Sequence, residues 1–481
     1  MNSAIRHLAV VLVGLFVLLI LNLSWIQGID AGALDDHPAN TARAIQRGYA
    51  RERGPLISAD GVTLADSVRT KDALRFQRRY PLGALTGQVT GYLSVQNGSD
   101  MAEKAFNDEL LGSEAPVTLS SILDRLEGDL PGDAVQLTVD TRVQKVAQDR
   151  LDGRAGSVVA LDPRNGAVLA IYSNPTFDPN PLADHDAQAA GAAFERLNGD
   201  PDKPLLPRAY REIFPPGSTF KIITTTAALT SGTATPDSTF PQQREIALPQ
   251  TRLTLSNFEN EMCGGTLVQS FTKSCNTVFG ALALQVGAET MAATARGYGF
   301  DQDVPFALRA VQSNYPDVAE LDQNKPELAF SGIGQGNVAA TPLEMCLTAA
   351  AVANNGVIMT PQVGKVVRDP KGNVIASFGP KPWLTATDPA TAAQLESMMV
   401  SVVQQGTGRP AALDNVQVAG KTGTAQTGRG GKPHAWFVGF APAEAPRVAV
   451  AVLVEEGGGT GGTVAGPIAA DVIRKALEVT P

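Results

Sequence analysis

The stretch Pro215-Pro216-Gly217-Ser218-Thr219-Phe220-Lys221, followed by the apolar run Ile222–Leu229, decides the fold of this chain. Proline and glycine interrupt regular structure, so the sequence predicts a helix that begins at Ser218. Positions i and i+3 share one face of a helix, which places Ser218 and Lys221 side by side at its N-terminus. A serine hydroxyl becomes a good nucleophile when a neighbouring base takes its proton. Lys221 can be that base if burial or a nearby cation lowers its pKa.

The same Ser-x-x-Lys pattern occurs again at Ser270-Phe271-Thr272-Lys273. A single match is equally typical of a helix-capping serine beside a solvated lysine. A second motif, Ser274-Cys275-Asn276, stands before the apolar helical run Val278–Val286 and offers a hydroxyl and an amide on one short turn. Ser270 is only four residues from this turn, so we expect it to belong to the same local element. The pattern therefore favours Ser218 as the nucleophile.

A third motif, Gly420-Lys421-Thr422-Gly423-Thr424, opens a strand-like run. Lys421 supplies a second cation, and the two threonines supply hydroxyls that can bind a carboxylate. Gly423 lets a bound chain approach the backbone closely, because glycine has no side chain. An ordinary strand edge guarded by a lysine is the alternative interpretation of this motif alone.

The order Ser-x-x-Lys, Ser-x-Asn, Lys-Thr-Gly resembles that of the serine acyltransferases that react with penicillin, namely penicillin-binding proteins and serine β-lactamases. Further stretches look like class B penicillin-binding proteins, most similar to the PbpA type of actinobacteria. They are Arg53-Gly54-Pro55-Leu56-Ile57 with Asp60-Gly61, Arg79-Tyr80-Pro81, Gly332-Ile333-Gly334-Gln335-Gly336 with Thr341-Pro342, and Ala435-Trp436-Phe437-Val438-Gly439-Phe440-Ala441-Pro442. One residue departs from the pattern, because Glu344 stands where many relatives have glutamine.

This resemblance implies a peptidoglycan D,D-transpeptidase that works through an acyl-enzyme. Lys221, kept neutral by burial and by Lys421, takes the proton of Ser218, which attacks the penultimate D-alanine of a stem peptide. The backbone N–H groups of Ser218 and Thr424 form the oxyanion hole. Ser274 relays a proton to the departing D-alanine.

The resemblance also assigns substrate contacts. Asn276 orients Lys221 and the peptide amide, while Thr422, Gly423 and Thr424 bind the terminal carboxylate. An amine from a neighbouring stem peptide then resolves the acyl-enzyme. β-Lactam antibiotics enter the same route and inhibit it, and the family uses no cofactor.

The implied partners are the lipid-linked precursor, a polytopic membrane glycosyltransferase and division or elongation proteins. A β-lactamase is the nearest rival, but it needs a deacylating glutamate in a Glu-x-x-Leu-Asn context, which the sequence does not contain. A D,D-carboxypeptidase stays an alternative, because water competes with an amine for the same acyl-enzyme. So does a non-enzymatic division scaffold.

Charge and hydropathy bound the location of the protein. The net charge of -9 gives no electrostatic reason to bind nucleic acid. The apolar run Leu8–Ile26 is long enough to span a bilayer, and Arg6 before it favours a cytoplasmic N-terminus and an extracytoplasmic catalytic domain. The rival is a cleaved signal peptide, for which Ala31-Gly32-Ala33 offers a small-residue pattern. We expect a single-pass anchor in the cell membrane.

The chain of 481 residues suggests two or three domains. We expect a cytoplasmic tail at 1–7, the anchor at 8–27, and a small mixed, dimerisation- or pedestal-like domain at 28–134 with a hairpin turn at Asp60-Gly61. The transpeptidase domain follows at 135–481. It should be an α+β fold with an antiparallel sheet flanked by helices, because short β-rich runs stand at both ends of a helical middle.

Three smaller features complete the expectations. Cys263 and Cys275 are close in sequence, so a disulfide is possible outside the cytoplasm, but both cysteines can equally be free. No His, Cys, Asp or Glu cluster has the spacing of a metal site, and His434 reads as structural. The glycines of 457–462 read as a loop, and a final helix is expected at about 467–477.

Overall fold

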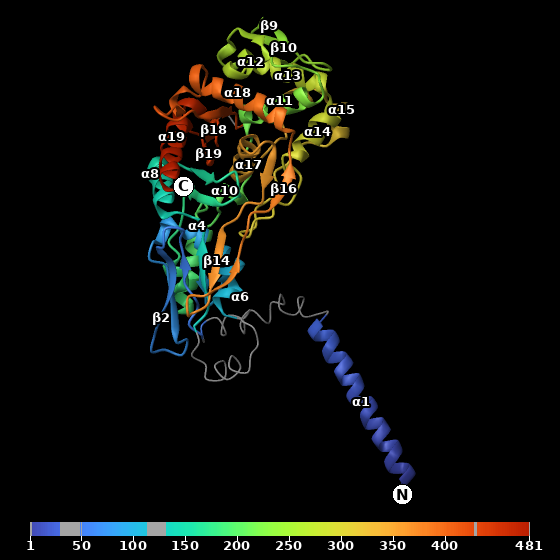
Figure 1. Ribbon diagram of the computed structural model, residues 1–481, viewed down its shortest axis with the longest axis vertical. Helices are drawn as coiled ribbons and strands as arrows, with labels where there is room; N and C mark the ends of the chain where they lie inside the picture. The colour runs from blue at the N-terminus through green and yellow to red at the C-terminus, as the bar shows by residue number, and fades with distance from the viewer. Residues whose placement is uncertain (1, 29–48, 50, 113–130, 428–430, 481) are drawn as a thin grey trace.

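The computed structural model describes residues 2–28, 49, 51–112, 131–427 and 431–480 (Figure 1). The pattern Ala31-Gly32-Ala33, which bears on the choice between an anchor and a cleaved signal peptide, lies outside these residues. Helix α1 (Asn2–Gly28) contains the run Ile5–Ile26, which is long and apolar enough to cross a membrane and none of which is buried. The expected single membrane anchor is consistent with this helix.

A five-stranded antiparallel sheet organises the C-terminal part of the chain, in the order β17-β18-β19-β7-β8. Its strands come from both ends of that part, as the sequence predicts: β7 (Gly156–Leu161), β8 (Val168–Asn174), β17 (Ala419–Ala425), β18 (His434–Ala441) and β19 (Val448–Val454). The strands β18 and β19 are buried on both faces, so helices must cover the sheet on either side. The expected α+β class with an antiparallel sheet is confirmed.

Helices α8 (Thr141–Leu151) and α19 (Gly461–Val479) cover one face of this sheet, and α17 (Pro342–Ala353) covers the other. One hydrophobic cluster lies under α8 and α19, and a larger one runs from the opposite face through the helical region. The helical region contains α11 (Lys221–Thr230), α12 (Leu267–Lys273), α13 (Asn276–Val286), α14 (Ala288–Gly297), α15 (Val318–Gln323), α16 (Lys325–Ser331) and α18 (Pro389–Gln405).

The last helix begins earlier than the sequence predicted. It starts at Gly461, so the glycine stretch of 457–462 is a loop only up to Thr460. Thr460 and Thr463 form a reciprocal capping box, which sets the start of α19 and leaves Pro467 inside the helix. The expected start at about residue 467 was wrong, because the capping box lies seven residues earlier.

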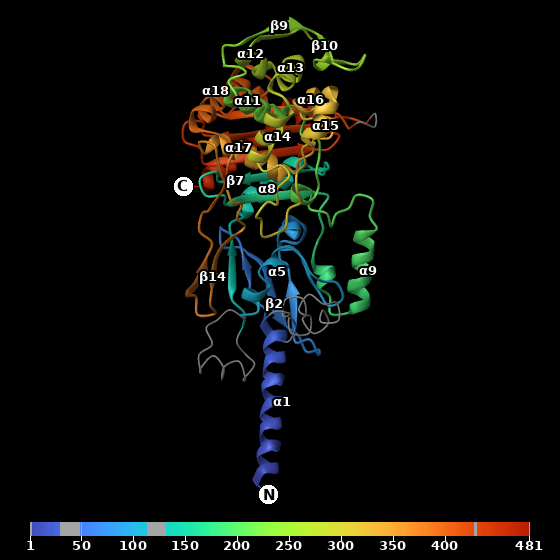
Figure 2. The same ribbon diagram turned by 90° about the vertical axis from the view of Figure 1, so that its right-hand side faces the viewer.

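A second sheet of six strands crosses the expected boundary between residues 134 and 135. Its order is β15-β14-β6-β1-β2-β3, so a hairpin from far along the chain completes the N-terminal sheet. The strands are β1 (Leu56–Ile57), β2 (Thr63–Arg69), β3 (Phe76–Arg79), β6 (Ala134–Leu137), β14 (Gly364–Arg368) and β15 (Val374–Ser377). In Figures 1 and 2 this sheet lies below the five-stranded one. The predicted hairpin turn is present, with Gly61 at φ +82° between β1 and β2.

Shorter elements connect these layers. They are α4 (Gly87–Thr90), β4 (Leu93–Ser94), β5 (Gly98–Ser99), α5 (Met101–Ala105), α6 (Asn107–Leu110), α9 (Ala187–Asn198), α10 (Arg208–Arg211), β9 (Thr239–Gln243), β10 (Glu245–Ala247), β11 (Thr254–Ser256), β12 (Cys263–Thr266), β13 (Val357–Met359) and β16 (Pro382–Thr385).

A buried ion triad holds the N-terminal sheet to α5. Glu103 accepts from Arg53 Nε and from Arg78 Nε, both at 2.6 Å, and all three side chains are almost fully buried. Removing one member of such a group leaves an uncompensated buried charge. The arginine of the Arg53-Gly54-Pro55 motif is therefore structural.

Glu344 on α17 is a buried carboxyl group. It is fully buried, and neither of its oxygens has a hydrogen-bond partner within the described residues. Burial raises its pKa from 4.5 to about 8. The folded protein therefore keeps a proton that the unfolded chain releases, so this group lowers the free energy of unfolding as pH rises from 4.5 towards 8.

We expect Glu344→Gln to remove this pH dependence. At pH 5 the variant should unfold like the wild type, and at pH 8 it should be more stable by about 3–5 kcal/mol, because the amide carries no proton to lose. Denaturant unfolding of both proteins at the two pH values measures the difference. An unchanged slope of stability against pH in the variant would contradict this assignment.

Candidate active site

The predicted nucleophile lies on a tight turn before a helix. Residues Gly217–Phe220 form a 3-10 turn, and the α-helix α11 begins at Lys221, three residues later than expected. Side chains three residues apart eclipse each other in a 3-10 turn, so Ser218 and Lys221 still share one face. Ser218 is partly exposed, whereas Lys221 is fully buried. A substrate can therefore reach the hydroxyl while the amine stays out of water.

The turn is held in place by two distant segments. Gly217 has φ +55°, and its N–H donates to Gly334 O at 2.9 Å. A Cβ at Gly334 would lie 2.2 Å from Gly217 O, so only glycine fits there. On the other side, Trp436 Nε1 donates to Pro215 O at 3.1 Å. Gly334 and Trp436 belong to motifs that carry the family resemblance, but their role in holding this turn could not be predicted from the sequence.

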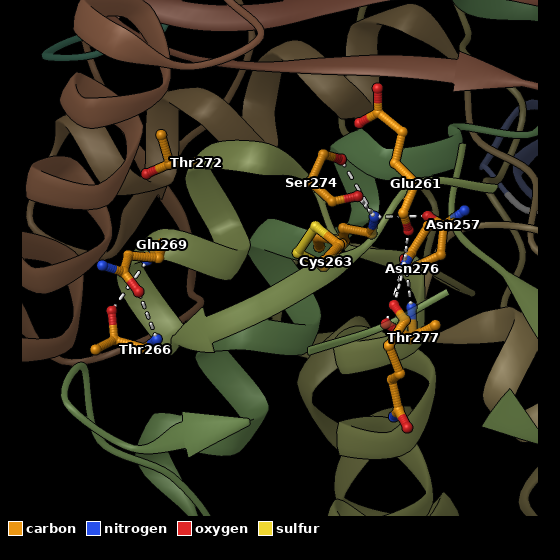
Figure 3. Close-up of a disulfide and its surroundings, with 12 residues drawn as sticks. Asn257, Glu261, Cys263, Thr266, Gln269, Thr272, Ser274, Asn276 and Thr277 are labelled. Atoms are coloured by element: carbon orange, nitrogen blue, oxygen red, sulfur yellow. Dashed lines mark hydrogen bonds between the residues drawn. A yellow bond between two sulfur atoms is a disulfide. The ribbon is translucent and has the colours of Figure 1, made fainter. Parts of the chain in front are cut away.

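Lys221 contacts the Ser-x-Asn motif through three oxygens. Its Nζ lies 2.7 Å from Ser274 O, 3.2 Å from Ser274 Oγ and 2.8 Å from Asn276 Oδ1. Ser274 ends α12 with a left-handed backbone, φ 65° and ψ 42°, and this turn directs its carbonyl and hydroxyl to the same amine. Figure 3 shows Ser274 and Asn276 close together on this turn.

Lys421 on β17 brings the third motif to the same point. Its Nζ donates to Ser274 Oγ at 2.9 Å and to Thr422 O at 3.0 Å. The strand β17 is at the edge of the five-stranded sheet, so its outer side faces the turn of Ser218. The two lysines are 200 positions apart in the sequence and share the hydroxyl of Ser274.

Burial sets the electrostatics of the two amines. Burial and the positive charge of Lys421 together hold the pKa of Lys221 well below its usual range. Burial also lowers the pKa of Lys421, to about 7. Lys221 lies over the ring of Phe279 at 5.3 Å and Lys421 over that of Phe271 at 5.7 Å, which partly offsets the cost of a buried cation. Lys221 is thus the amine that gives up its proton first.

The Lys-Thr-Gly strand packs directly on the nucleophile turn. A Cβ at Gly423 would lie 2.9 Å from Pro216 O and 3.0 Å from Thr219 Cγ2. Gly423 therefore allows a close approach to the protein's own turn, and its expected approach to a bound chain stays a prediction. Thr422 Oγ1 is hydrogen-bonded to Thr407 Oγ1 at 2.6 Å, and Thr424 Oγ1 accepts from Gly461 N at 3.3 Å.

The second Ser-x-x-Lys match does not form such a site. Ser270 lies inside α12, as expected, and is fully buried, whereas Lys273 is exposed. The hydroxyl of Ser270 has no hydrogen-bond partner among the residues that the structure describes. Folding, rather than the motif itself, distinguishes the two serines.

The open question of the cysteines is answered by the structure. Cys263 and Cys275 form a disulfide, which ties β12 to the middle residue of the Ser-x-Asn motif (Figure 3). Cys346 is a buried free thiol on α17. His434 packs its ring edge-on against Phe214 and accepts from Glu456 N through Nδ1, in agreement with a structural role.

A hydroxyl shared by two buried amines beside a partly exposed serine is suited to moving protons to and from a nucleophile. The site is thus of the serine acyltransferase class. Residues 156–474 match the family model described as the penicillin binding protein transpeptidase domain, and residues 53–135 match the penicillin binding protein A dimerisation domain.

Curated relatives and solved structures agree with these models. The chain is 39% identical to a peptidoglycan D,D-transpeptidase PbpA of Mycolicibacterium smegmatis, over 99% of both chains. It is 38% identical to the PbpA of Mycobacterium tuberculosis over the full length of both. A ceftriaxone acyl-enzyme complex of penicillin-binding protein A from M. tuberculosis superposes with a TM-score of 0.84, at 37% identity, covering 90% of this chain and 100% of that one. The chain therefore belongs to the class B penicillin-binding proteins, and its full-length relatives are of the actinobacterial PbpA type.

Proposed function

We propose that this chain is a peptidoglycan D,D-transpeptidase that forms an acyl-enzyme at Ser218 and is inhibited by β-lactams at the same residue. The observation that carries the proposal is the hydroxyl of Ser274, held between Lys221 Nζ at 3.2 Å and Lys421 Nζ at 2.9 Å. The activity named for the PbpA relatives and the acyl-enzyme complex of the similar structure support it.

The hydrogen bonds of Lys221 define its protonation cycle. Ser274 O and Asn276 Oδ1 can only accept, so a neutral amine donates both of its N–H groups to them. Its lone pair is then left to accept a proton from a hydroxyl, and we infer that this hydroxyl is that of Ser218, three residues earlier on the same face of the turn. When Lys221 takes the proton of Ser218, the oxygen of Ser218 attacks the carbonyl of the penultimate D-alanine. All three N–H groups of the new ammonium then have acceptors, the third being Ser274 Oγ.

This change frees the proton of Ser274 for the leaving group. The C–N bond to the terminal D-alanine breaks, Ser274 protonates its amine, and Lys221 returns a proton to Ser274. Lys421 donates to the same oxygen and stabilises negative charge that develops there. The amine of a second stem peptide then attacks the acyl carbonyl and forms the new C–N bond, and the C–O bond to Ser218 breaks. The proton lost by this amine returns to Ser218 through Ser274 and Lys221, in the reverse order. No step needs a cofactor.

The remaining expected residues bind the substrate. Asn276 Nδ2 donates to Ser256 O at 3.0 Å, which leaves its second N–H for a carbonyl of the peptide. The hydroxyls of Thr422 and Thr424 bind the terminal carboxylate next to Gly423. The backbone N–H groups of Ser218 and Thr424 stabilise the oxyanion. The edge position of β17 supports this placement, because an edge strand leaves backbone groups unpaired.

The location and partners follow the family resemblance. The N-terminus lies in the cytoplasm, α1 spans the membrane once, and the catalytic domain is extracytoplasmic, where a disulfide such as that of Cys263 is stable. Its proposed partners are the lipid-linked precursor, a polytopic glycosyltransferase, and division or elongation proteins. We propose that residues 28–134 and 135–481 are two units with different functions. They are not two separate folding layers, because the N-terminal sheet takes strands from both ranges.

Product analysis with the detergent-solubilised full chain tests this function. The donor is a synthetic stem peptide ending in D-alanyl-D-alanine, and the acceptor is a D-amino acid in excess. We expect mass spectrometry to detect the exchange product, in which the acceptor replaces the terminal D-alanine. Only the shortened peptide would indicate a D,D-carboxypeptidase. Absence of both products, together with absence of a penicillin adduct, would indicate a non-enzymatic scaffold.

A further inference from the structure

Asn276 is held between the active site and a segment outside it. Its Oδ1 accepts from Lys221 Nζ at 2.8 Å, and its Nδ2 donates to Ser256 O at 3.0 Å. These two bonds fix the amide rotamer, because exchange of oxygen and nitrogen would leave both partners mismatched. The orientation of Asn276 towards Lys221 therefore depends on the backbone at the end of β11.

The helix that begins at Asn276 is capped from the same segment. Its own N-cap residue, Cys275, makes no side-chain capping bond. Instead, Asn257 Oδ1 accepts from Thr277 N at 3.0 Å and from Thr277 Oγ1 at 3.2 Å. An acceptor for the first N–H groups of a helix is normally supplied by the preceding residue, and here it comes from 20 residues earlier in the chain.

Asn257 is itself held rigidly. It is 6% exposed, and its Nδ2 donates to Gln243 O at 2.8 Å and to Glu261 O at 3.1 Å (Figure 3). The two residues after Phe258 have left-handed backbones, with φ 50° at Glu259 and φ 57° at Asn260. Non-glycine residues keep such conformations where surrounding contacts impose them, often at functional sites.

We propose that Asn257 is a positioning residue for acylation of Ser218. By capping α13 it fixes the first turn of that helix, and so holds Asn276 at hydrogen-bonding distance from Lys221. The Cys263–Cys275 disulfide ties the same segment to the residue before Asn276. This inference rests on the proposed function, because it concerns the base that activates Ser218.

The test uses the full chain in detergent and a fluorescent penicillin, with the second-order acylation rate measured between pH 5 and 9. Asn257→Ala should lower the rate at pH 7 by about 10- to 100-fold, because a small displacement of a catalytic group is costly. The rise of the rate on the acid side of the profile, its acid limb, should also move to lower pH. The reason is that Lys221 loses its hydrogen bond to Asn276 Oδ1, the acceptor that favours the ammonium form. Lys421 is the charged group that the structure places against Lys221. The neighbouring ends of α12 and α13 present the polar groups of Ser274 and Asn276 to it, and α13 also presents the ring of Phe279.

Two further variants separate positioning from stability. Asn324→Ala removes a capping bond of the same type, in which Asn324 Oδ1 accepts from Glu327 N at 3.2 Å at the start of α16, and it should be acylated like the wild type. Asn257→Asp keeps the acceptor oxygen for Thr277 N–H and should be acylated faster than Asn257→Ala. Its carboxylate should move the acid limb to higher pH.

The outcomes are distinct. Acylation of Asn257→Ala at the rate of Asn324→Ala, with an unmoved acid limb, overturns the positioning role. If Asn257→Ala does not fold, the rate of Asn257→Asp at its own pH optimum decides: a rate below that of Asn324→Ala supports the role, and an equal rate overturns it. If the wild-type chain is not acylated at all, the proposed function fails together with this inference.

Discussion

Replacement of Ser218 by alanine is expected to abolish covalent labelling by a fluorescent penicillin, with the acylation rate reduced by about 10⁴-fold or more. The reason is that the acyl group loses its acceptor, because the remaining hydroxyl near Lys221 and Lys421, that of Ser274, is hydrogen-bonded to both amines. Intact-protein mass spectrometry of wild type and variant after incubation with the antibiotic measures the adduct directly. Loss of labelling through misfolding is excluded if the variant keeps the melting temperature of the wild type. We expect this because Ser218 is partly exposed.

The chain offers a matched control in its second Ser-x-x-Lys sequence. Ser270→Ala makes the same chemical change in the same local pattern, but at a buried hydroxyl with no partner in the described part of the chain. Removal of an unsatisfied buried polar group costs little, so the variant should fold normally and be labelled like the wild type. Labelling that survives in Ser218→Ala and disappears in Ser270→Ala would reverse the assignment of the nucleophile.

The choice between these two serines shows what the sequence could predict. The three motifs and their order were sufficient to infer that Ser218, Lys221, Ser274 and Lys421 belong to one site. The sequence could not predict that the two amines meet at the hydroxyl of Ser274, because that depends on β17 being an edge strand. Edge positions follow from long-range strand order, which local patterns do not encode.

The elements that were mispredicted have a similar cause. The start of α11 shifted by three residues because Gly217, Gly334 and Trp436 hold a 3-10 turn, and two of these residues are distant in sequence. The β14–β15 hairpin joins the N-terminal sheet by long-range pairing with β6, which local patterns could not predict; the division at residues 134 and 135 stays a prediction. The cap of α13 by Asn257 was missed because helix signals are sought at the preceding residue, and Cys275 gives none.

Replacement of Lys421 by methionine is expected to change the pH dependence of acylation as well as its rate. In the wild type the rate should rise with pH as Lys221 loses its proton, and fall again as Lys421 loses its charge, for which burial sets a pKa of about 7. Without Lys421, the positive charge that lowers the pKa of Lys221 is absent, so the acid limb should move to higher pH. The alkaline limb should disappear.

The rate at the optimum should fall by about 10²- to 10³-fold, because Ser274 Oγ loses a charged donor. Methionine fills a similar buried volume, so the loss can be assigned to charge rather than to a cavity. Lys273→Met is the control. It makes the same chemical change at an exposed lysine, that of the second Ser-x-x-Lys sequence. The second-order acylation rate of each variant across pH 5 to 9 separates two roles of Lys421. A weaker rate with both limbs unmoved would mean that Lys421 only binds the substrate carboxylate, whereas displaced limbs mean that it controls the proton held by Lys221.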